Sequence, residues 1–205
     1  MRRLVLASGN RAKLAELRRL LAGLDVEVVP YSEVSDEPLP EETGETFEEN
    51  AALKARAAAE VSGLPALADD SGLCVEALNG APGVRSARFA GEGASYEQLV
   101  AKLLEAIAAV PPGRRGARFV CAVAAASPDG AVELVRGECA GRIAEAPRGK
   151  SGFGYDPVFV PEGDRRTFAQ MSPEEKDAVS HRGRALAALR RSLEGGLLDR
   201  LVAGS

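Results

Sequence analysis

Apolar and polar positions alternate in short blocks over the first thirty residues of the chain. Residues 3–7 (Arg-Leu-Val-Leu-Ala) form a short run rich in strand-forming residues that ends at Ser-Gly-Asn. The residues that then recur at helical spacing are Leu14, Leu17, Leu20 and Leu21. Residues 26–29 (Val-Glu-Val-Val) predict a second strand, which is closed by a proline. Because a strand, a glycine turn and an amphipathic helix open many α/β domains, this pattern predicts an α/β fold.

The remainder of the chain continues the same mixture of elements. A buried strand is predicted over residues 66–68 and runs into residues 69–72 (Asp-Asp-Ser-Gly), and residues 127–130 (Ser-Pro-Asp-Gly) predict a hairpin turn. Residues 172–175 (Ser-Pro-Glu-Glu) form a capping box, which predicts the start of a helix. Helices are predicted over residues 46–61, 96–110 and 182–198, and strands over residues 117–126, 131–145 and 157–160.

The amino-acid composition says little about the fold, but it limits the kinds of metal site that the chain can form. The 205 residues include one histidine and three cysteines, and the cysteines stand far apart at Cys74, Cys121 and Cys139. A single imidazole excludes metal sites with two or three histidine ligands, and three isolated cysteines do not indicate a disulfide framework. Any metal chemistry is therefore expected to use carboxylates and a hard cation such as Mg²⁺.

Charge and hydropathy exclude two classes of partner. The formal net charge of −4 argues against a protein that coats nucleic acid. No apolar run approaches the roughly 20 residues that a membrane span requires, and the apolar stretch after Met1 is too short for a signal peptide. We therefore expect a cytoplasmic protein with neither a membrane nor a nucleic acid as its partner.

Two segments in the first half of the chain carry charged groups at predicted strand ends. Residues 8–13 (Ser-Gly-Asn-Arg-Ala-Lys) place a glycine turn and Lys13 at a helix start, which is a natural anion site, although many such turns bind nothing. Asp69 and Asp70 follow a buried strand, where adjacent acids either hold a cation or form an ordinary turn. Glu41 and Glu42 are a second source of carboxylates, and Lys54 either faces these acids or makes surface ion pairs.

Two further segments lie in the last third of the chain. Residues 152–157 (Gly-Phe-Gly-Tyr-Asp-Pro) suit an exposed aromatic platform for a planar base, with ordinary loop packing as the alternative. Residues 180–184 (Ser-His-Arg-Gly-Arg) place His181 and Arg182 at a helix start, where hydrogen-bond donors converge on an anion or a carbonyl. Together with the acids and the anion turn, these segments supply the parts of a nucleoside-triphosphate site.

Five segments in this order resemble the inosine triphosphate pyrophosphatase family, in particular its bacterial branch. They cover residues 6–17, 41–55, 66–91, 151–163 and 171–186. The resemblance implies a single domain over residues 1–205 with two lobes, in which an elongated mixed β-sheet is flanked by helices and the active site lies in the central cleft. It also implies a homodimer. The implied reaction is the Mg²⁺-dependent hydrolysis of ITP, dITP and XTP to the monophosphate and pyrophosphate.

The resemblance also implies a role for each matching residue. Asp70 is the implied proton acceptor, and Glu41 and Asp70 are the implied Mg²⁺ ligands. The triphosphate would be held by Ser8, Gly9, Asn10, Arg11, Ala12 and Lys13, with Lys54 near the phosphates and Ser71 in contact with substrate. The base would be framed by Phe153, Gly154, Tyr155 and Asp156, and its pocket completed by Lys176, His181 and Arg182.

Two other functions are compatible with parts of this pattern. A pyrophosphatase for modified pyrimidine triphosphates has a similar architecture, but that class lacks the paired segments at 152–157 and 180–182. A nucleotide-binding sensor without catalysis is a second alternative, against which the intact acids and lysines argue. A panel of nucleotides, assayed for pyrophosphate release, separates all three.

Overall fold

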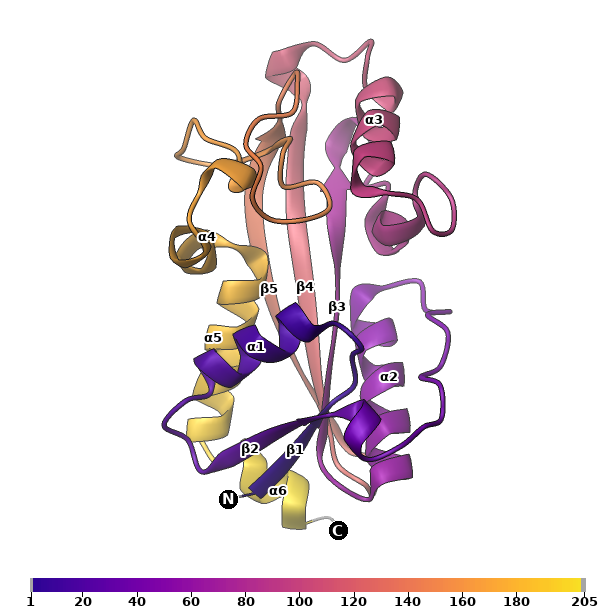
Figure 1. Cartoon of the computed structure of the whole chain (residues 1–205), viewed down its shortest axis with the longest axis vertical. Coiled ribbons are helices and arrows are strands. Elements are labelled where there is room, and N and C mark those ends of the chain that lie inside the picture. The colour runs from indigo at the N-terminus through magenta and orange to yellow at the C-terminus, as the bar shows by residue number, and fades with distance from the viewer. Residues whose placement is uncertain (1, 204–205) are drawn as a thin grey trace. The chain divides into compact units, whose positions relative to one another are not determined.

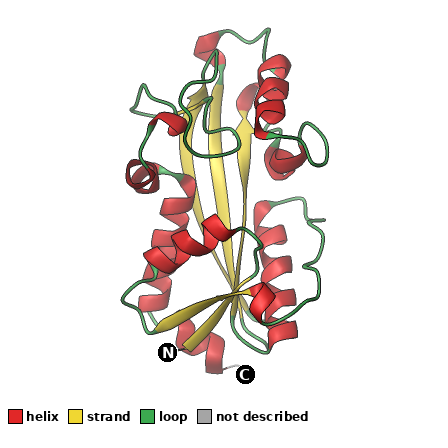
Figure 2. Cartoon of the chain, in the orientation of Figure 1, coloured by secondary structure: helices red, strands yellow, loops and turns green. Residues whose placement is uncertain are grey.

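The computed structural model describes residues 2–203, without the side chains of residues 11, 12, 20 and 203. The chain forms a six-stranded mixed sheet with helices beside it, which confirms the predicted α/β class (Figures 1 and 2). The strand order is β2-β1-β3-β4-β5-β6. The strands are β1 (Arg2–Leu6), β2 (Val26–Pro30), β3 (Ala66–Val75), β4 (Gly116–Ala126), β5 (Val132–Ile143) and β6 (Phe159–Pro161). The helices are α1 (Arg11–Leu20), α2 (Phe47–Ser62), α3 (Tyr96–Ala106), α4 (Pro173–Val179), α5 (His181–Glu194) and α6 (Leu197–Ala203).

The chain divides into two compact units. The first comprises Met1–Asp70, Ala122–Arg136 and Ala185–Ser205, and the second comprises Ser71–Cys121 and Gly137–Arg184. The boundaries fall inside β3, β4, β5 and α5, so the backbone of each of these elements continues from one unit into the other. The first boundary is the peptide bond between Asp70 and Ser71.

The first unit is built on parallel pairing at β1. Strand β1 pairs in parallel with β2 and with β3, and its Leu4 and Val5 are fully buried. Helix α2 contacts β1 and presents a face of small residues, of which Ala51, Ala55 and Ala58 are fully buried. Small side chains let a helix backbone approach a strand closely, so the alanine-rich composition of this segment has a packing role.

Helix α2 begins and ends at signals that are visible in the sequence. The Thr46 hydroxyl accepts the backbone N–H of Glu49, and the Glu49 carboxylate accepts the backbone N–H of Thr46, which completes a capping box. Gly63 ends the helix in the left-handed conformation, with φ of 63°. The capping box and Gly63 fix where α2 begins and ends, and thereby fix the positions of Asn50 and Lys54 along the helix.

The second unit has an aromatic core. Phe119 packs edge-on against Phe159, with ring centroids 4.7 Å apart, and Phe168 lies 5.0 Å from Phe159. Helix α3 contributes Leu99, Val100 and Leu103 to the same core. This packing holds two segments that carry candidate site residues, namely the loop before β6 and the start of α5.

The predicted capping box and hairpin turn are confirmed. Ser172 and Glu175 cap α4 reciprocally, and the backbone of Gly130 donates to the carbonyl of Ser127 in the turn between β4 and β5. The prediction of one final helix over residues 182–198 is wrong, because Gly195 and Gly196 separate α5 from α6 and Gly196 adopts φ of 87°.

Among residues 2–203, no helix is both long enough and apolar enough to cross a membrane.

Candidate active site

The turn between β1 and α1 is held by hydrogen bonds from its backbone to its own polar side chains. The backbone N–H of Asn10 donates to Oγ of Ser8 at 3.1 Å, and the backbone N–H of Lys13 donates to Oδ1 of Asn10 at 3.3 Å. A Cβ added at Gly9 would meet no atom within 4 Å, so the space over the turn is open. The side chains of Arg11 and Ala12, also expected here, lie outside those that the structure describes.

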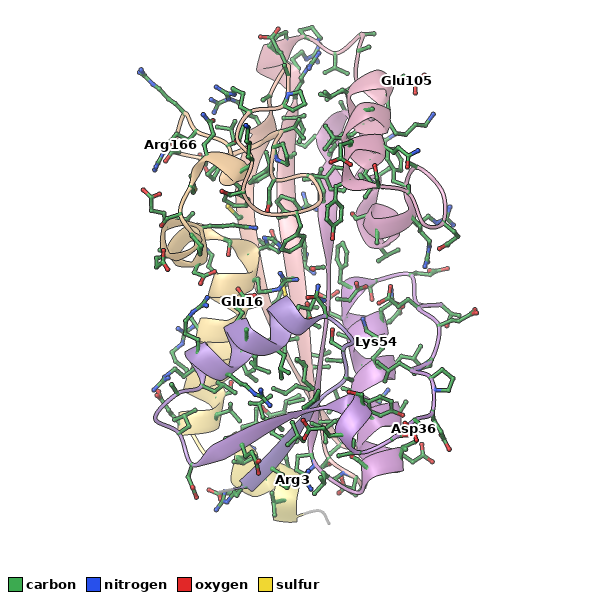
Figure 3. All side chains as sticks on the ribbon, viewed as in Figure 1. Arg3, Glu16, Asp36, Lys54, Glu105 and Arg166 are labelled. Atoms are coloured by element: carbon green, nitrogen blue, oxygen red, sulfur yellow. The ribbon has the colours of Figure 1, made fainter. Side chains whose placement is uncertain are left out.

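Two lysines of the first unit converge on Asp69. The Nζ atom of Lys13 lies 2.8 Å from Oδ2 of Asp69. Lys54, which lies on α2 (Figure 3), donates from Nζ to the carbonyl oxygen of Asp69 at 2.9 Å and forms an ion pair with Glu42. Both lysine side chains are largely buried, so their charges are weakly screened by solvent. The structure thus brings together four of the charged residues that the sequence singled out.

Asn50 is a member of this cluster that sequence reasoning missed. Its amide Nδ2 donates to Oδ2 of Asp70 at 3.0 Å, and its Oδ1 accepts the backbone N–H of Gly44 at 2.8 Å. The side chain is completely buried. A buried amide must satisfy its hydrogen bonds, so Asn50 ties the carboxylate of Asp70 to the acidic loop before α2. The available signal was a polar residue four positions before Lys54, on a helix that is otherwise rich in alanine.

Gly44 shows why the acidic loop can approach α2. A Cβ at this position would lie 2.7 Å from Cβ of Glu49 and 2.8 Å from Oδ1 of Asn50. Only glycine leaves room for the backbone contact with Asn50. The loop that carries Glu41 and Glu42 is therefore held against the same helix as Lys54.

The donor set of this cluster fits a hard divalent cation. The carboxylates of Asp69 and Asp70 are buried, which is costly for adjacent charges unless cations or donors satisfy them. Glu42 is partly exposed and Glu41 is exposed in the adjacent loop. Among residues 2–203, no three His, Cys, Asp or Glu side chains converge as a ready metal cage. Carboxylates such as those of Asp69 and Asp70 are the oxygen ligands that Mg²⁺ takes in ones or twos, with water and substrate phosphates completing its shell.

The second unit begins one residue after Asp70. Oγ of Ser71 accepts a hydrogen bond from Nη2 of Arg182 at 3.2 Å, and Arg182 is buried. A Cβ at Gly183 would lie 1.8 Å from the carbonyl oxygen of Asp177, so α4 and α5 meet at this glycine. The residues around Arg182 are thereby fixed by close backbone packing.

His181 lies at the same helix start and is buried. Its ring stacks on Phe119, with centroids 4.6 Å apart and an interplanar angle of 10°. The backbone N–H of Gly183 donates to Oγ of Ser180, which caps this end of α5. The structure therefore holds His181 and Arg182 in one rigid helix start.

The loop at residues 152–156 is organised by Asp156. Oδ2 of Asp156 accepts the backbone N–H of Phe153 at 2.9 Å and lies 2.6 Å from Nζ of Lys176. Gly152 adopts φ of +80°, and a Cβ there would lie 2.1 Å from the same oxygen. Asp156 is 2% exposed, so its role in the chain is to shape the loop around Lys176.

Of the two rings expected on an exposed aromatic platform, only Phe153 is exposed. Its ring is approached by Nζ of Lys176 at 4.7 Å and by the guanidinium carbon of Arg182 at 5.6 Å from the centroid. The expectation of an exposed ring at Tyr155 is wrong, because its side chain is 3% exposed and its hydroxyl donates to the carbonyl oxygen of Ser86 at 2.8 Å. Burial raises the pKa of this phenol.

Ser86 is a second residue that sequence reasoning missed. Besides the bond from Tyr155, its Oγ accepts the backbone N–H of Leu73 at 2.8 Å and donates to the carbonyl oxygen of Gly83 at 2.6 Å. Leu73 lies two residues after Ser71 on β3. One small buried hydroxyl residue therefore connects β3 with the loop that carries Phe153.

Comparison with known proteins decides the family. The Ham1 family profile matches residues 4–192. This chain belongs to the Ham1 family. A Cutibacterium acnes protein named dITP/XTP pyrophosphatase is 56% identical over 194 residues, covering 92% of this chain and 95% of that protein. A Mycobacterium tuberculosis protein of the same name is 57% identical over 190 residues, covering 91% and 93%.

Solved structures of Ham1 proteins have the same fold as this chain. A HAM1 protein from Coxiella burnetii is 48% identical, with a TM-score of 0.91, and covers 95% of this chain and 100% of its own. A Mycobacterium abscessus protein described as a nucleoside-triphosphatase and dITP/XTP pyrophosphatase is 50% identical, with a TM-score of 0.79 and coverage of 91% and 98%. The family resemblance predicted from the five segments is thereby confirmed.

Proposed function

We propose that this Ham1 protein hydrolyses nonstandard purine nucleoside triphosphates, namely ITP, dITP and XTP, to the monophosphate and pyrophosphate. The observation that carries the proposal is the convergence of Lys13 and Lys54 on Asp69, one residue before the buried carboxylate of Asp70. Paired cations beside paired acids are the groups that a phosphoryl-transfer site requires. The dITP/XTP pyrophosphatases from C. acnes and M. tuberculosis support the choice of substrate.

Asp70 and Glu41 are the residues that would hold Mg²⁺. When bound, the cation neutralises phosphate charge and lowers the pKa of a bound water. Asn50 orients Asp70 by donating to its Oδ2 atom. We assign the carboxylate of Asp70 as the group that accepts the proton of the attacking water.

Hydrolysis needs no reactant besides the nucleotide and water. The water oxygen forms a bond to the α-phosphorus, and the bond from that phosphorus to the bridging oxygen toward the β-phosphorus breaks. The electron pair of the broken bond leaves with pyrophosphate. Lys13 and Lys54 exchange their contacts with Asp69 for phosphate oxygens and stabilise the charge that accumulates there.

The second unit supplies the residues proposed to recognise the base. Hypoxanthine and xanthine carry a 6-keto oxygen, which accepts hydrogen bonds, where adenine carries an amino group, which donates them. Lys176 and Arg182 are donors, and both approach the ring of Phe153. A donor set of this kind favours the keto bases, because it leaves the adenine amino group facing other donors.

A nucleotide panel tests this function. Pyrophosphate release is measured with ITP, dITP, XTP, ATP and modified pyrimidine triphosphates, each with and without Mg²⁺. We expect release from ITP, dITP and XTP only, and only with the cation. Asp70→Asn should lower kcat by at least about 100-fold, because general-base catalysis contributes that much, while nucleotide binding persists.

Asp36→Asn is the matched control for this substitution. Asp36 is an exposed acid between β2 and α2, and the variant should keep full activity. Near-normal turnover in Asp70→Asn, or equal release from ATP and ITP, contradicts the proposal.

The proposal includes two further expectations from the family resemblance, a homodimer and a cytoplasmic location. Sedimentation velocity of the purified protein tests the dimer.

A further inference from the structure

Two large aromatic side chains of the second unit are exposed beside each other. Tyr96 is 53% exposed and Phe153 is 39% exposed. Their ring centroids lie 6.3 Å apart with an interplanar angle of 44°, which is within the range of interacting aromatic pairs. The two residues are 57 positions apart in the sequence, so only the fold brings them together.

Tyr96 is held firmly although its ring is exposed. It is the first residue of α3 and lies between Ser95 and Gln98, which form the capping box of this helix. The next turn of the helix buries Leu99 and Val100 in the core. The backbone under Tyr96 is therefore fixed from both sides, and its ring has a defined place beside Phe153.

The neighbours of Phe153 indicate what this aromatic pair contacts. Lys176 and Arg182 both approach the ring of Phe153, and Lys176 is held by Asp156. Hydrogen-bond donors therefore lie beside an exposed aromatic surface. A planar, electron-rich ring with keto oxygens is the ligand that such a surface suits, because stacking and donor contacts can be satisfied together.

We propose that Tyr96 is a further substrate contact, which extends the Phe153 surface and packs against the purine base. The inference rests on the proposed function and adds a residue to it. Stacking uses the π-face that every base has, so Tyr96 strengthens binding without selecting among bases. Lys176 and Arg182 carry the selection.

Steady-state kinetics test this contact with two substitutions. Tyr96→Ala should raise KM for ITP and for XTP by the same factor, between about five- and a hundredfold, since a stacked base contributes roughly 1–3 kcal/mol. The kcat values should stay within about twofold, because the reacting atoms are elsewhere. Tyr96→Phe keeps an aromatic ring and should restore KM.

Tyrosine fluorescence provides a readout that does not depend on turnover. The protein has no tryptophan, and its other tyrosines, Tyr31 and Tyr155, are buried. Emission that iodide quenches therefore reports on Tyr96. The α,β-methylene analogue of ITP should protect this emission from iodide in the wild type, and the protected signal should be absent in Tyr96→Phe.

Leu134→Ala is the matched control, since Leu134 is also large, apolar and exposed but lies on β5 in the first unit. An unchanged KM in Tyr96→Ala, or a loss confined to kcat, overturns the role of Tyr96 while leaving the proposed function intact. Absence of pyrophosphate release in the wild type would instead overturn the proposed function.

Discussion

At the scale of single residues, the molecule relies on buried polar side chains that serve two partners at once. Asn50 contacts both Gly44 and Asp70, and Asp156 contacts both Phe153 and Lys176. The hydroxyl of Ser86 does the same between the backbone N–H of Leu73 and the carbonyl oxygen of Gly83. Removing one such group leaves a buried partner without its hydrogen bond, which costs about 1–3 kcal/mol.

Asn50→Asp is expected to reduce kcat about 10- to 100-fold with little change in KM. The aspartate keeps an oxygen for the backbone N–H of Gly44, but it replaces the donor to Asp70 with a second carboxylate. Like charges at this distance repel, so Asp70 loses its orientation. Residues that orient a catalytic group typically account for a loss of this size. Steady-state kinetics with ITP measure both constants.

Thermal unfolding and a second variant complete the Asn50 experiment. Asn50→Ala removes both hydrogen bonds and should lower Tm as well as kcat. Asn50→Asp should lower kcat with the smaller effect on Tm. If Asn50→Asp turns over at the wild-type rate, the positioning role of Asn50 is wrong.

At the scale of elements, close contacts between the backbones of neighbouring helices decide where the candidate site side chains lie. Helices α4 and α5 are adjacent in sequence, and their junction places Lys176 and Arg182 beside one ring. The junction is tight because Gly183 packs on the carbonyl of Asp177. The sequence predicted the start of α4 from its capping box and placed α5 within one longer final helix, but the function of this glycine is visible only in the packed junction.

Gly183→Ala is expected to destabilise the protein. Its Cβ would lie 1.8 Å from a backbone oxygen, so α4 and α5 must separate. Overpacking costs about 1–3 kcal/mol, and each kcal/mol lowers Tm by about 2–4 °C in a chain of this length, so a fall of about 2–12 °C follows. Differential scanning calorimetry gives the value.

Gly113→Ala is the control for this prediction. A Cβ at Gly113 would meet nothing within 4 Å, so its Tm should stay within about 1 °C of the wild type. Equal shifts in the two variants would mean that the close approach at Gly183 has no energetic consequence.

At the scale of the whole molecule, the two units share long elements of the chain. Strands β3, β4 and β5 and helix α5 each contribute residues to both units. The strand-forming runs of β3, β4 and β5 were predicted, with end positions shifted by a few residues. The peptide bond between Asp70 and Ser71 connects two groups of residues. Asp70 belongs with the acids and lysines proposed to act on the phosphates, and Ser71 belongs with Arg182, which is proposed to recognise the base. A single strand thereby carries residues of both.

The three cysteines provide a test of packing across the chain. Cys74, Cys121 and Cys139 are all buried as free thiols, and burial raises the pKa of Cys139. A maleimide reagent at neutral pH should therefore modify none of them rapidly in the native protein, and all three after unfolding in guanidinium chloride. Mass spectrometry counts the modified thiols. Rapid native-state labelling of any one would contradict the packing described.

The sequence by itself determined the local features of this protein. Caps such as Ser172 with Glu175, the turn at Gly130 and the helical spacing of apolar residues act within a few positions, so they were visible without the fold. The five family segments also determined which residues are candidates for chemistry. Tertiary structure decided that Tyr155 is buried, that Asn50 reaches Asp70 and that Tyr96 lies beside Phe153. These contacts join residues between 20 and 69 positions apart, and at such separations packing alone decides which side chains meet.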